Sequence, residues 1–246
     1  DQIWARELTH GFDPVYFGQF APMRKKISYA ASVPNGSIPE AEQEYFKNAL
    51  ASLAHISVRE EKLALAVEKL TGKEVTTVVD PTLLLEKADY EDLLYKDRIV
   101  KEKYIFAYYV VENEMLSKCA QRAAKEYGYR LIELHYKKTP KIKGENMIFD
   151  AGPSEFLTYI RDAELVLTNS FHGTVFSVLF QKLFYSVYKE NGRITNLLTF
   201  LNLERRHIET DAKMDFKDKI DYTTVAEKLC SYREKSVEYL EKGIEQ

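Results

Sequence analysis

The chain has 246 residues, 45% hydrophobic and 30% charged, which is typical of a globular protein with one or two domains. Its net charge of −3 gives no general attraction to nucleic acid or to an anionic membrane. Its two cysteines form neither a disulfide framework nor a metal-binding spacing, which favours a cytoplasmic location, and no apolar run approaches the roughly 18 residues that span a bilayer.

The first half of the chain alternates short apolar runs with amphipathic segments. The expected strands are 26–33, 55–58 and 75–79, and the expected helices are 40–54 and 60–70. Gly72 is placed to end the second of these helices.

A charged stretch at 86–103 has few apolar positions in register, and we place a domain boundary there. Beyond it the expected strands are 104–111, 129–136, 164–168 and 183–188, and the expected helices are 113–127, 155–163, 173–181, 194–202 and 222–244. Ser154 is predicted to cap the helix at 155–163. Strands separated by helices favour an α/β fold with doubly wound parallel sheets, nearly complete in the second half and incomplete in the first.

The segment LVLTNSFHGT at 165–174 is the strongest local candidate for a binding site. A buried strand is expected to run into a polar turn that opens onto an apolar helix. Ligands of open α/β sheets bind where the strands end, and a helix N-terminus attracts phosphate or carboxylate. Asn169, Ser170 and Gly173 would then contact the ligand, and His172 could transfer a proton near neutral pH. The same residues equally fit a structural role, with Ser170 as a helix cap and His172 packed against a carbonyl.

Two arginines occupy similar positions. Arg59 follows a predicted short strand, and Arg193 precedes the predicted helix at 194–202. Planar arginine side chains suit carboxylate and phosphate groups, so these residues together with His172 resemble an anion pocket. The alternative is that Arg59 pairs with the glutamates that follow it and that Arg193 is a surface residue of a turn.

Several familiar sites are not indicated. The sequence has no P-loop, no G-x-S-x-G nucleophile elbow, no H-E-x-x-H motif and no acidic metal cluster, so we expect no metal. Basic residues gather without interleaved aromatic residues, which favours a solvated loop over a nucleic-acid surface; they are Lys137, Lys138, Lys141 and Lys143.

Seven short segments, in this order, make the chain resemble the polysaccharide pyruvyl transferase family. They are DQIW at 1–4, KISYAAS at 26–32, ISVRE at 56–60, DPTLL at 80–84, GPSEF at 152–156, AELVLTNSFHGT at 163–174 and RITNLL at 193–198. The combination is specific, above all ISVRE, DPTLL and TNSFHGT. DQIW lies well inside members of the family, so the resemblance implies a fragment that lacks the N-terminal part.

The resemblance implies a GT-B-like fold of two Rossmann-like domains that face each other across a cleft. Residues 1–90 would be the C-terminal part of the first Rossmann-like domain, residues 100–220 would be the second, donor-binding domain, and a helix at 221–246 would pack back toward the first domain. The implied reaction transfers a pyruvyl group from phosphoenolpyruvate to two hydroxyls of a polysaccharide or of its precursor. The products are a pyruvate ketal and phosphate, and no further cofactor is implied.

By the same resemblance, Arg59, His172 and Arg193 form the donor site. His172 would act as a proton donor, and Asp1 is a candidate base on the acceptor side. We expect His172 and Arg193 to lie close together in the second domain, and Arg59 to reach the same cleft from the first.

Two other functions remain open. One is a GT-B glycosyltransferase that uses a nucleotide-sugar, although no acidic ribose clamp can be assigned. The other is a non-catalytic, sugar-binding relative, against which the intact Arg59, His172 and Arg193 argue. For the transferase, the expected setting is exopolysaccharide and cell-envelope biosynthesis in the cytoplasm, with peripheral contact to a lipid-linked acceptor and no bound nucleic acid.

Overall fold

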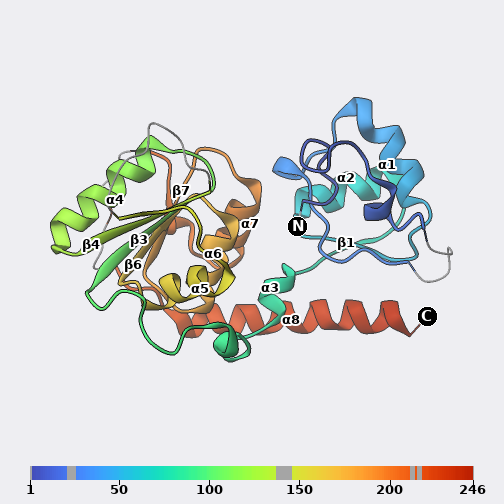
Figure 1. Ribbon diagram of the computed structural model, residues 1–246. Helices are drawn as coiled ribbons and strands as arrows, with labels where there is room; N and C mark the ends of the chain where they lie inside the picture. Colours follow the sequence, from blue (N-terminus) through green and yellow to red (C-terminus); the bar gives the residue numbers. More distant parts are fainter. Residues whose placement is uncertain (1, 21–25, 137–145, 211–213, 215–217, 246) are drawn as a thin grey trace. The chain divides into compact units, whose positions relative to one another are not determined.

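The computed structural model describes residues 2–20, 26–136, 146–210, 214 and 218–245, and it divides into two compact units (Figure 1). The first unit comprises Asp1–Leu84, Glu190–Leu197 and Val225–Gln246, and the second comprises Leu85–Lys189 and Leu198–Thr224. The first boundary between the two units falls between Leu84 and Leu85, just before the charged stretch at 86–103. Residues 190–197, which the sequence analysis assigned to the second domain, belong to the first unit.

The sheet of the first unit has two parallel strands, β1 (Ile56–Val58) and β2 (Val75–Thr77). They are connected by α2 (Glu61–Thr71), whose apolar side packs into the core of the unit. Gly72 ends α2 in the left-handed conformation, with a φ of 68°, as the sequence predicts.

The segment predicted as a strand at 26–33 is interrupted. It makes isolated parallel bridges beside β1, and between them Ala30 has a φ of 52°. The Ser57 hydroxyl spans the interruption, because it accepts a hydrogen bond from the Ala30 N–H at 3.2 Å and donates one to the Ser28 carbonyl at 2.8 Å. A left-handed alanine is uncommon, and the apolar pattern of the segment carries no signal for it.

The remaining elements of the first unit are short, apart from the last helix of the chain. They are the 3-10 turns Pro14–Phe17, Pro34–Gly36 and Glu40–Glu42, and the helices α1 (Gln43–Leu50) and α3 (Pro81–Leu84). The helix predicted at 222–244 is α8 (Tyr222–Ile244). It is tied to the first unit by Tyr239, whose hydroxyl donates to the Ser28 carbonyl at 2.7 Å, and by Ser236, which accepts from the Val79 N–H at 3.0 Å.

The second unit is built on a six-stranded parallel sheet with the order β5-β4-β3-β6-β7-β8. Its strands are β3 (Tyr104–Tyr109), β4 (Arg130–His135), β5 (Met147–Ile148), β6 (Leu165–Thr168), β7 (Phe184–Val187) and β8 (His207–Ile208). This is the strand order of the doubly wound dinucleotide-binding fold, and the direction of winding reverses between β3 and β6. The two-residue edge strands β5 and β8 were not predicted.

Helices cover both faces of this sheet (Figure 1). They are α4 (Glu114–Tyr127), α5 (Pro153–Asp162) and α6 (Phe171–Leu179), with a 3-10 helix at Lys87–Leu93 and another at Glu204–Arg206. Ile105 of β3 joins the core under α4, whereas the next residue, Phe106, stacks on Tyr159 of α5 at 5.5 Å. Successive strand residues point to opposite faces, so this alternation places α4 and α5 on opposite sides of the sheet. The α/β class and the parallel sheets agree with the sequence.

The helices α5 and α7 begin at residues other than those predicted. The N-cap of α5 is Gly152 rather than Ser154, because Pro153 occupies the first helical position, where its missing N–H and fixed φ are favourable. α7 (Gly192–Phe200) begins within the part of the chain that belongs to the first unit and ends in the second.

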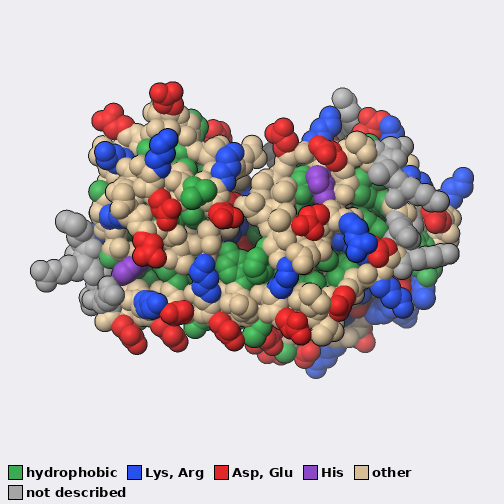
Figure 2. Space-filling view, turned by 180° about the vertical axis from the view of Figure 1, so that it is seen from behind, with side chains coloured by type: hydrophobic (Ala, Val, Ile, Leu, Met, Phe, Trp, Pro, Cys, Tyr) green, Lys and Arg blue, Asp and Glu red, His purple; other side chains and the backbone are tan. Residues whose placement is uncertain are grey.

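Acidic and basic side chains are interspersed over the face shown in Figure 2, in keeping with the small net charge. Within the described residues, no helix is both long and apolar enough to cross a membrane. The basic stretch at 137–143 lies outside the described residues.

Candidate functional site

The segment singled out at 165–174 lies at the point where the sheet of the second unit reverses its winding. β6 ends at Thr168, and Ser170 caps α6 by accepting a hydrogen bond from the Gly173 N–H at 3.1 Å. Asn169 holds the neighbouring strand end: it accepts from the Val110 N–H at 2.9 Å and donates to the Val111 carbonyl at 2.7 Å. Both ends of its amide are therefore engaged with backbone. The side chains of Asn169 and Ser170 shape the turn through these bonds.

Gly173 has a packing reason to be glycine. A Cβ atom at this position would lie 2.5 Å from Thr168 Oγ1, closer than side-chain atoms approach each other. That hydroxyl is fixed, since it donates to the Tyr108 carbonyl at 2.9 Å and accepts from the Ser170 N–H at 3.0 Å. Gly173 thus lets α6 start close against the end of β6.

His172 lies on the first turn of α6 and is partly exposed. Its ring meets the ring of Phe171 edge to face, with the ring centres 5.3 Å apart. A partly exposed imidazole at a helix start beside a topological switch point is well placed to meet a ligand of this sheet.

A second group of polar residues lies in the first unit, where two neighbouring parallel strands end. Arg59 follows β1, Asp80 lies shortly after β2, and the two side chains form an ion pair. Their side chains are only 4% and 3% exposed. Asp80 also accepts from the backbone N–H of Thr82 at 3.0 Å and from its hydroxyl at 2.6 Å, which fixes the carboxylate at the start of α3.

Glu60 is the most deeply buried member of this group, at 1% exposure. One carboxylate oxygen accepts from the Ser32 hydroxyl at 2.6 Å, and the other, Oε2, is buried without a hydrogen-bond partner among the described residues. Burial raises the pKa of Glu60, an effect that Ser32, Arg59 and Arg193 oppose.

Arg193 completes the group. Burial lowers the pKa of its guanidinium to about 10, Arg59 acts in the same direction, and Glu60 and Asp80 oppose the shift. Its neighbour Gly192 packs against the Pro34–Gly36 turn of the same unit, since a Cβ there would lie 3.4 Å from the Asn35 Cα. We call Arg59, Glu60, Asp80 and Arg193 the arginine cluster.

The arginine cluster holds two cations and two carboxylates within electrostatic range of one another. Two guanidinium groups that repel each other in a largely buried site are stabilised by an added anion. Clustered, strongly perturbed ionisable groups are also typical of functional sites. The two arginines are the candidate anion-binding groups of the cluster, whose formal charges sum to zero when both carboxylates are ionised.

The structure brings together some of the residues predicted from the sequence and separates others. Arg59 and Arg193 both belong to the first unit and lie within electrostatic range of each other, whereas His172 belongs to the second unit. The expectation that Arg193 lies in the second domain with His172 therefore differs from the structure. Asp1 lies outside the described residues.

Sequence reasoning did not assign a role to Glu60 or Asp80, although both stand in the quoted ISVRE and DPTLL segments. The available signal was their position: each follows a predicted strand, and neighbouring parallel strands end at one edge of a sheet. Among the residues that the structure describes, no three histidine, cysteine or acidic side chains are grouped as metal ligands.

Comparison with solved structures gave distant similarities. One is a UDP-GlcNAc 2-epimerase from Methanocaldococcus jannaschii, solved with UDP-GlcNAc and UDP (14% identity, TM-score 0.46, 80% of this chain and 56% of that chain). Another is the glycotransferase of kitacinnamycin (12% identity, TM-score 0.40, 81% of this chain and 58% of that chain). The chain thus spans less than two thirds of the length of either structure.

Comparison with curated protein sequences gave no match. The family model for polysaccharide pyruvyl transferase matches residues 8–189, well over half of the chain, and this range includes β1, β2, the Arg59–Asp80 pair and the His172 turn. The chain belongs to the polysaccharide pyruvyl transferase family.

Proposed function

We propose that the protein transfers the pyruvyl group of phosphoenolpyruvate to two hydroxyls of a saccharide. The observation that carries this proposal is that Arg59 and Arg193 lie within electrostatic range of each other in the first unit of a family member. Phosphoenolpyruvate has a carboxylate and a phosphate, and planar guanidinium groups bind both through paired, charge-assisted hydrogen bonds. A hydrogen bond to a charged group contributes about 1.5–3 kcal/mol, so loss of either arginine should weaken donor binding about tenfold or more.

The proposed chemistry forms two C–O bonds at C2 of the donor and breaks its bond to the phosphate oxygen. C3 first takes a proton and becomes a methyl group, which leaves positive charge at C2. A sugar hydroxyl attacks C2 and releases a proton, which replaces the one given to C3. A second hydroxyl then displaces phosphate, which carries away the second proton.

Among the described residues, His172 is our proposed proton donor. Its partial exposure at the start of α6 and the family resemblance support this role. General acid catalysis of this kind contributes typically about 10²–10⁴-fold in rate. We also propose that phosphoenolpyruvate needs no metal here, because arginines supply the positive charge. We further propose that the reaction takes place in the cytoplasm, on a polysaccharide or on its lipid-linked precursor.

The experiment is incubation of the protein with phosphoenolpyruvate and a panel of glycans, with phosphate release and the mass of the glycan as readouts. We expect phosphate and a pyruvate ketal to appear together, in the presence and absence of a chelator. His172→Asn should lower turnover with little change in donor affinity. Arg205→Met, at a side chain that is 86% exposed, is the matched control for Arg193→Met and should behave like the wild type.

One observation favours a second candidate, a nucleotide-sugar glycosyltransferase. The strand order of the second unit is that of dinucleotide-binding sheets, with His172 beside the switch point. Release of a nucleoside diphosphate, with no response to phosphoenolpyruvate, would favour this candidate. Binding of phosphoenolpyruvate without turnover of any glycan would instead indicate a non-catalytic relative.

A further inference from the structure

Glu60 of the arginine cluster is a buried carboxylate with one oxygen engaged and one not. It is the N-cap residue of α2 and is 1% exposed. Its Oε1 accepts from the Ser32 hydroxyl at 2.6 Å, whereas its Oε2 is buried and has no hydrogen-bond partner among the described residues. A buried carboxylate oxygen without a donor favours the protonated, neutral form of the acid.

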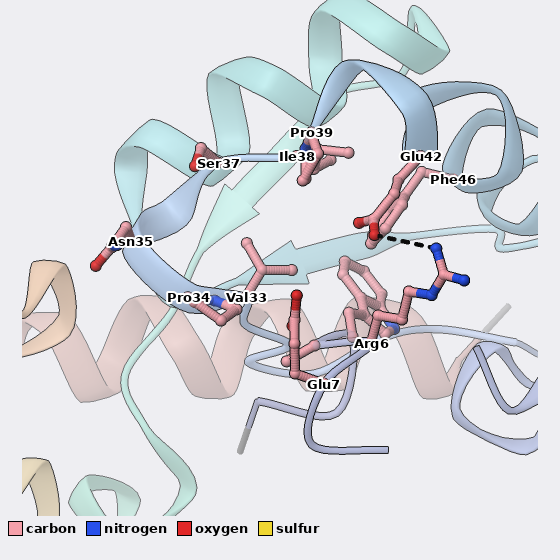
Figure 3. A pocket seen from close by; sticks show the side chains of 12 residues that line it. Arg6, Glu7, Val33, Pro34, Asn35, Ser37, Ile38, Pro39, Glu42 and Phe46 are labelled. Carbon is pink, nitrogen blue, oxygen red and sulfur yellow. Dashed lines mark ion pairs between the residues drawn. The ribbon is translucent and has the colours of Figure 1, made fainter. Parts of the chain in front are cut away.

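The Pro34–Gly36 turn packs directly on Glu60, since a Cβ atom on Gly36 would lie 3.4 Å from the Glu60 Cβ. The same turn lines a cavity of about 200 Å³, and its Asn35 side chain points away from that cavity (Figure 3). Glu60 is not one of the described residues that line the cavity. The cavity therefore does not bring water to the carboxylate of Glu60.

The charged and titratable groups that face Glu60 come from three elements. Arg59 precedes it directly after β1, Arg193 acts on it from the start of α7, and Tyr232 faces it from α8. Burial raises the pKa of Glu60 despite the opposing effects of Ser32 and the two arginines. Burial also raises the pKa of Tyr232, so its phenol stays neutral and adds no charge beside Glu60.

Glu60 is the member of the cluster whose charge is held least firmly. Asp80 is fixed as an anion, because it pairs with Arg59 and accepts two hydrogen bonds from Thr82, at 3.0 and 2.6 Å. The pKa of Arg193 is lowered only to about 10, so this guanidinium stays charged at neutral pH. The four formal charges sum to zero when Glu60 is ionised and leave the cluster positive when it is protonated. Its protonation therefore decides how strongly the cluster attracts an anion.

An anion reaches the cluster through Arg193, which is partly exposed, whereas the Arg59 side chain is 4% exposed. The anion adds negative charge near Glu60, and a nearby like charge disfavours the ionised form of a carboxyl group. This effect acts through space and needs no contact between the anion and Glu60. Linkage is reciprocal, so protonation of Glu60 strengthens anion binding by the factor by which the anion strengthens protonation.

We propose that an anion bound by the arginine cluster draws a proton from solvent onto Glu60, and that the cluster therefore binds its anion more tightly as the pH falls. The proton comes from the buffer and stays on the carboxyl group, so no bond of the anion forms or breaks. Glu60 acts through the charge of the cluster. The inference rests on the proposed function for the identity of the anion, phosphoenolpyruvate.

Calorimetric titrations in buffers of different ionisation enthalpy measure the number of protons taken up on binding. Sulfate and phosphoenolpyruvate are titrated separately into the protein, from about pH 5 to about pH 8. Sulfate is included because, unlike a phosphate ester with its pKa of about 6, it does not itself gain a proton in this range. We expect the wild type to take up as much as about one proton per anion, with an affinity that rises as much as about tenfold for each pH unit of decrease.

Glu60→Gln and Glu61→Gln form a matched pair, since each removes one carboxylate from the start of α2, at a buried and at an exposed residue. Glu60→Gln has the charge of protonated Glu60, so at about pH 8 it should bind sulfate about tenfold more tightly than the wild type and take up no proton. Glu61→Gln should behave like the wild type. A purely structural role of Glu60 predicts weaker binding or no change.

Two further variants guard the assignment of the proton. Ser32→Ala removes a hydrogen bond that favours ionised Glu60, so proton uptake should move to higher pH. This variant keeps the test decisive should Glu60→Gln fail to fold, because an unchanged pH range of uptake contradicts the inference. His172→Asn is titrated in parallel, since the proposed proton donor could also gain a proton; loss of uptake in this variant alone overturns the role of Glu60.

The inference is also overturned if the wild type takes up no proton, if Glu60→Gln retains the uptake, or if neither anion binds. These results are distinguishable from a failure of the proposed function. Binding of phosphoenolpyruvate without proton uptake refutes the role of Glu60 alone. Proton-linked binding of sulfate, with no binding of phosphoenolpyruvate, refutes the proposed donor alone.

Discussion

Asp80 should stabilise the first unit more than its partner Arg59 does. Both side chains are almost fully buried, so the pair belongs to the class in which removal of one partner leaves an uncompensated charge. Asp80→Asn leaves Glu60 as the remaining carboxylate of the arginine cluster, with Arg59 and Arg193 as its two cations. We expect a loss of about 3–5 kcal/mol in the free energy of unfolding.

Arg59→Met should cost less. Asp80 then keeps two hydrogen bonds from Thr82, at 3.0 and 2.6 Å, and the repulsion between Arg59 and Arg193 is removed. The double variant Arg59→Met/Asp80→Asn should be more stable than the sum of the single effects predicts, because it removes the buried pair as a whole.

Urea unfolding followed by tryptophan emission measures these effects, since Trp4 is the single tryptophan and lies in the first unit. Glu44→Gln, at an exposed residue of the same unit, serves as the control. A loss below about 1 kcal/mol for Asp80→Asn, as for an exposed ion pair, would refute the reasoning. So would a larger loss for Arg59→Met than for Asp80→Asn.

Three further predictions concern the two candidate sites. Arg193→Met should leave the stability of the first unit equal or higher while it weakens phosphoenolpyruvate binding, because burial and Arg59 disfavour this charge; urea unfolding and calorimetry measure the two effects. Burial raises the pKa of Glu60 above 4.5, so the folded state holds this proton more tightly than the unfolded state. The free energy of unfolding of the wild type should therefore fall, relative to that of Glu60→Gln, as the pH rises from below 4.5 through the raised pKa of the folded state. Urea unfolding of both proteins at several pH values measures this change. Gly173→Ala should destabilise the second unit by about 1–3 kcal/mol in thermal unfolding followed by circular dichroism, and the cost should shrink in a Thr168→Ala background, where the clashing hydroxyl is absent.

The elements with long, regular patterns could be read from the sequence. The continuous apolar run at 104–111 became β3, and the amphipathic segment at 222–244 became α8 with the same ends. β5 and β8 were missed because strands of two residues have no periodicity of their own. The break near Ala30 was missed because it depends on the Ser57 hydroxyl of a neighbouring segment.

The sequence predicted only part of the candidate site, because local patterns do not report contacts between distant segments. Arg59 and Arg193 were recognised because each stands at a turn between predicted elements. Their meeting in one unit depends on residues 190–197 returning to the first unit, and no local pattern reports such a tertiary contact. The structural role of Asn169 likewise comes from the end of the neighbouring strand β3, through Val110, whereas that of Gly173 comes from Thr168 at the end of β6.

The most direct measurement is a calorimetric titration of phosphoenolpyruvate into the wild type, Arg193→Met and the exposed control Arg205→Met. If the arginine cluster is the donor site, the wild type and Arg205→Met bind with the same affinity, and Arg193→Met binds about tenfold more weakly or worse. Equal affinity in all three proteins, or no binding to the wild type, would contradict the assignment.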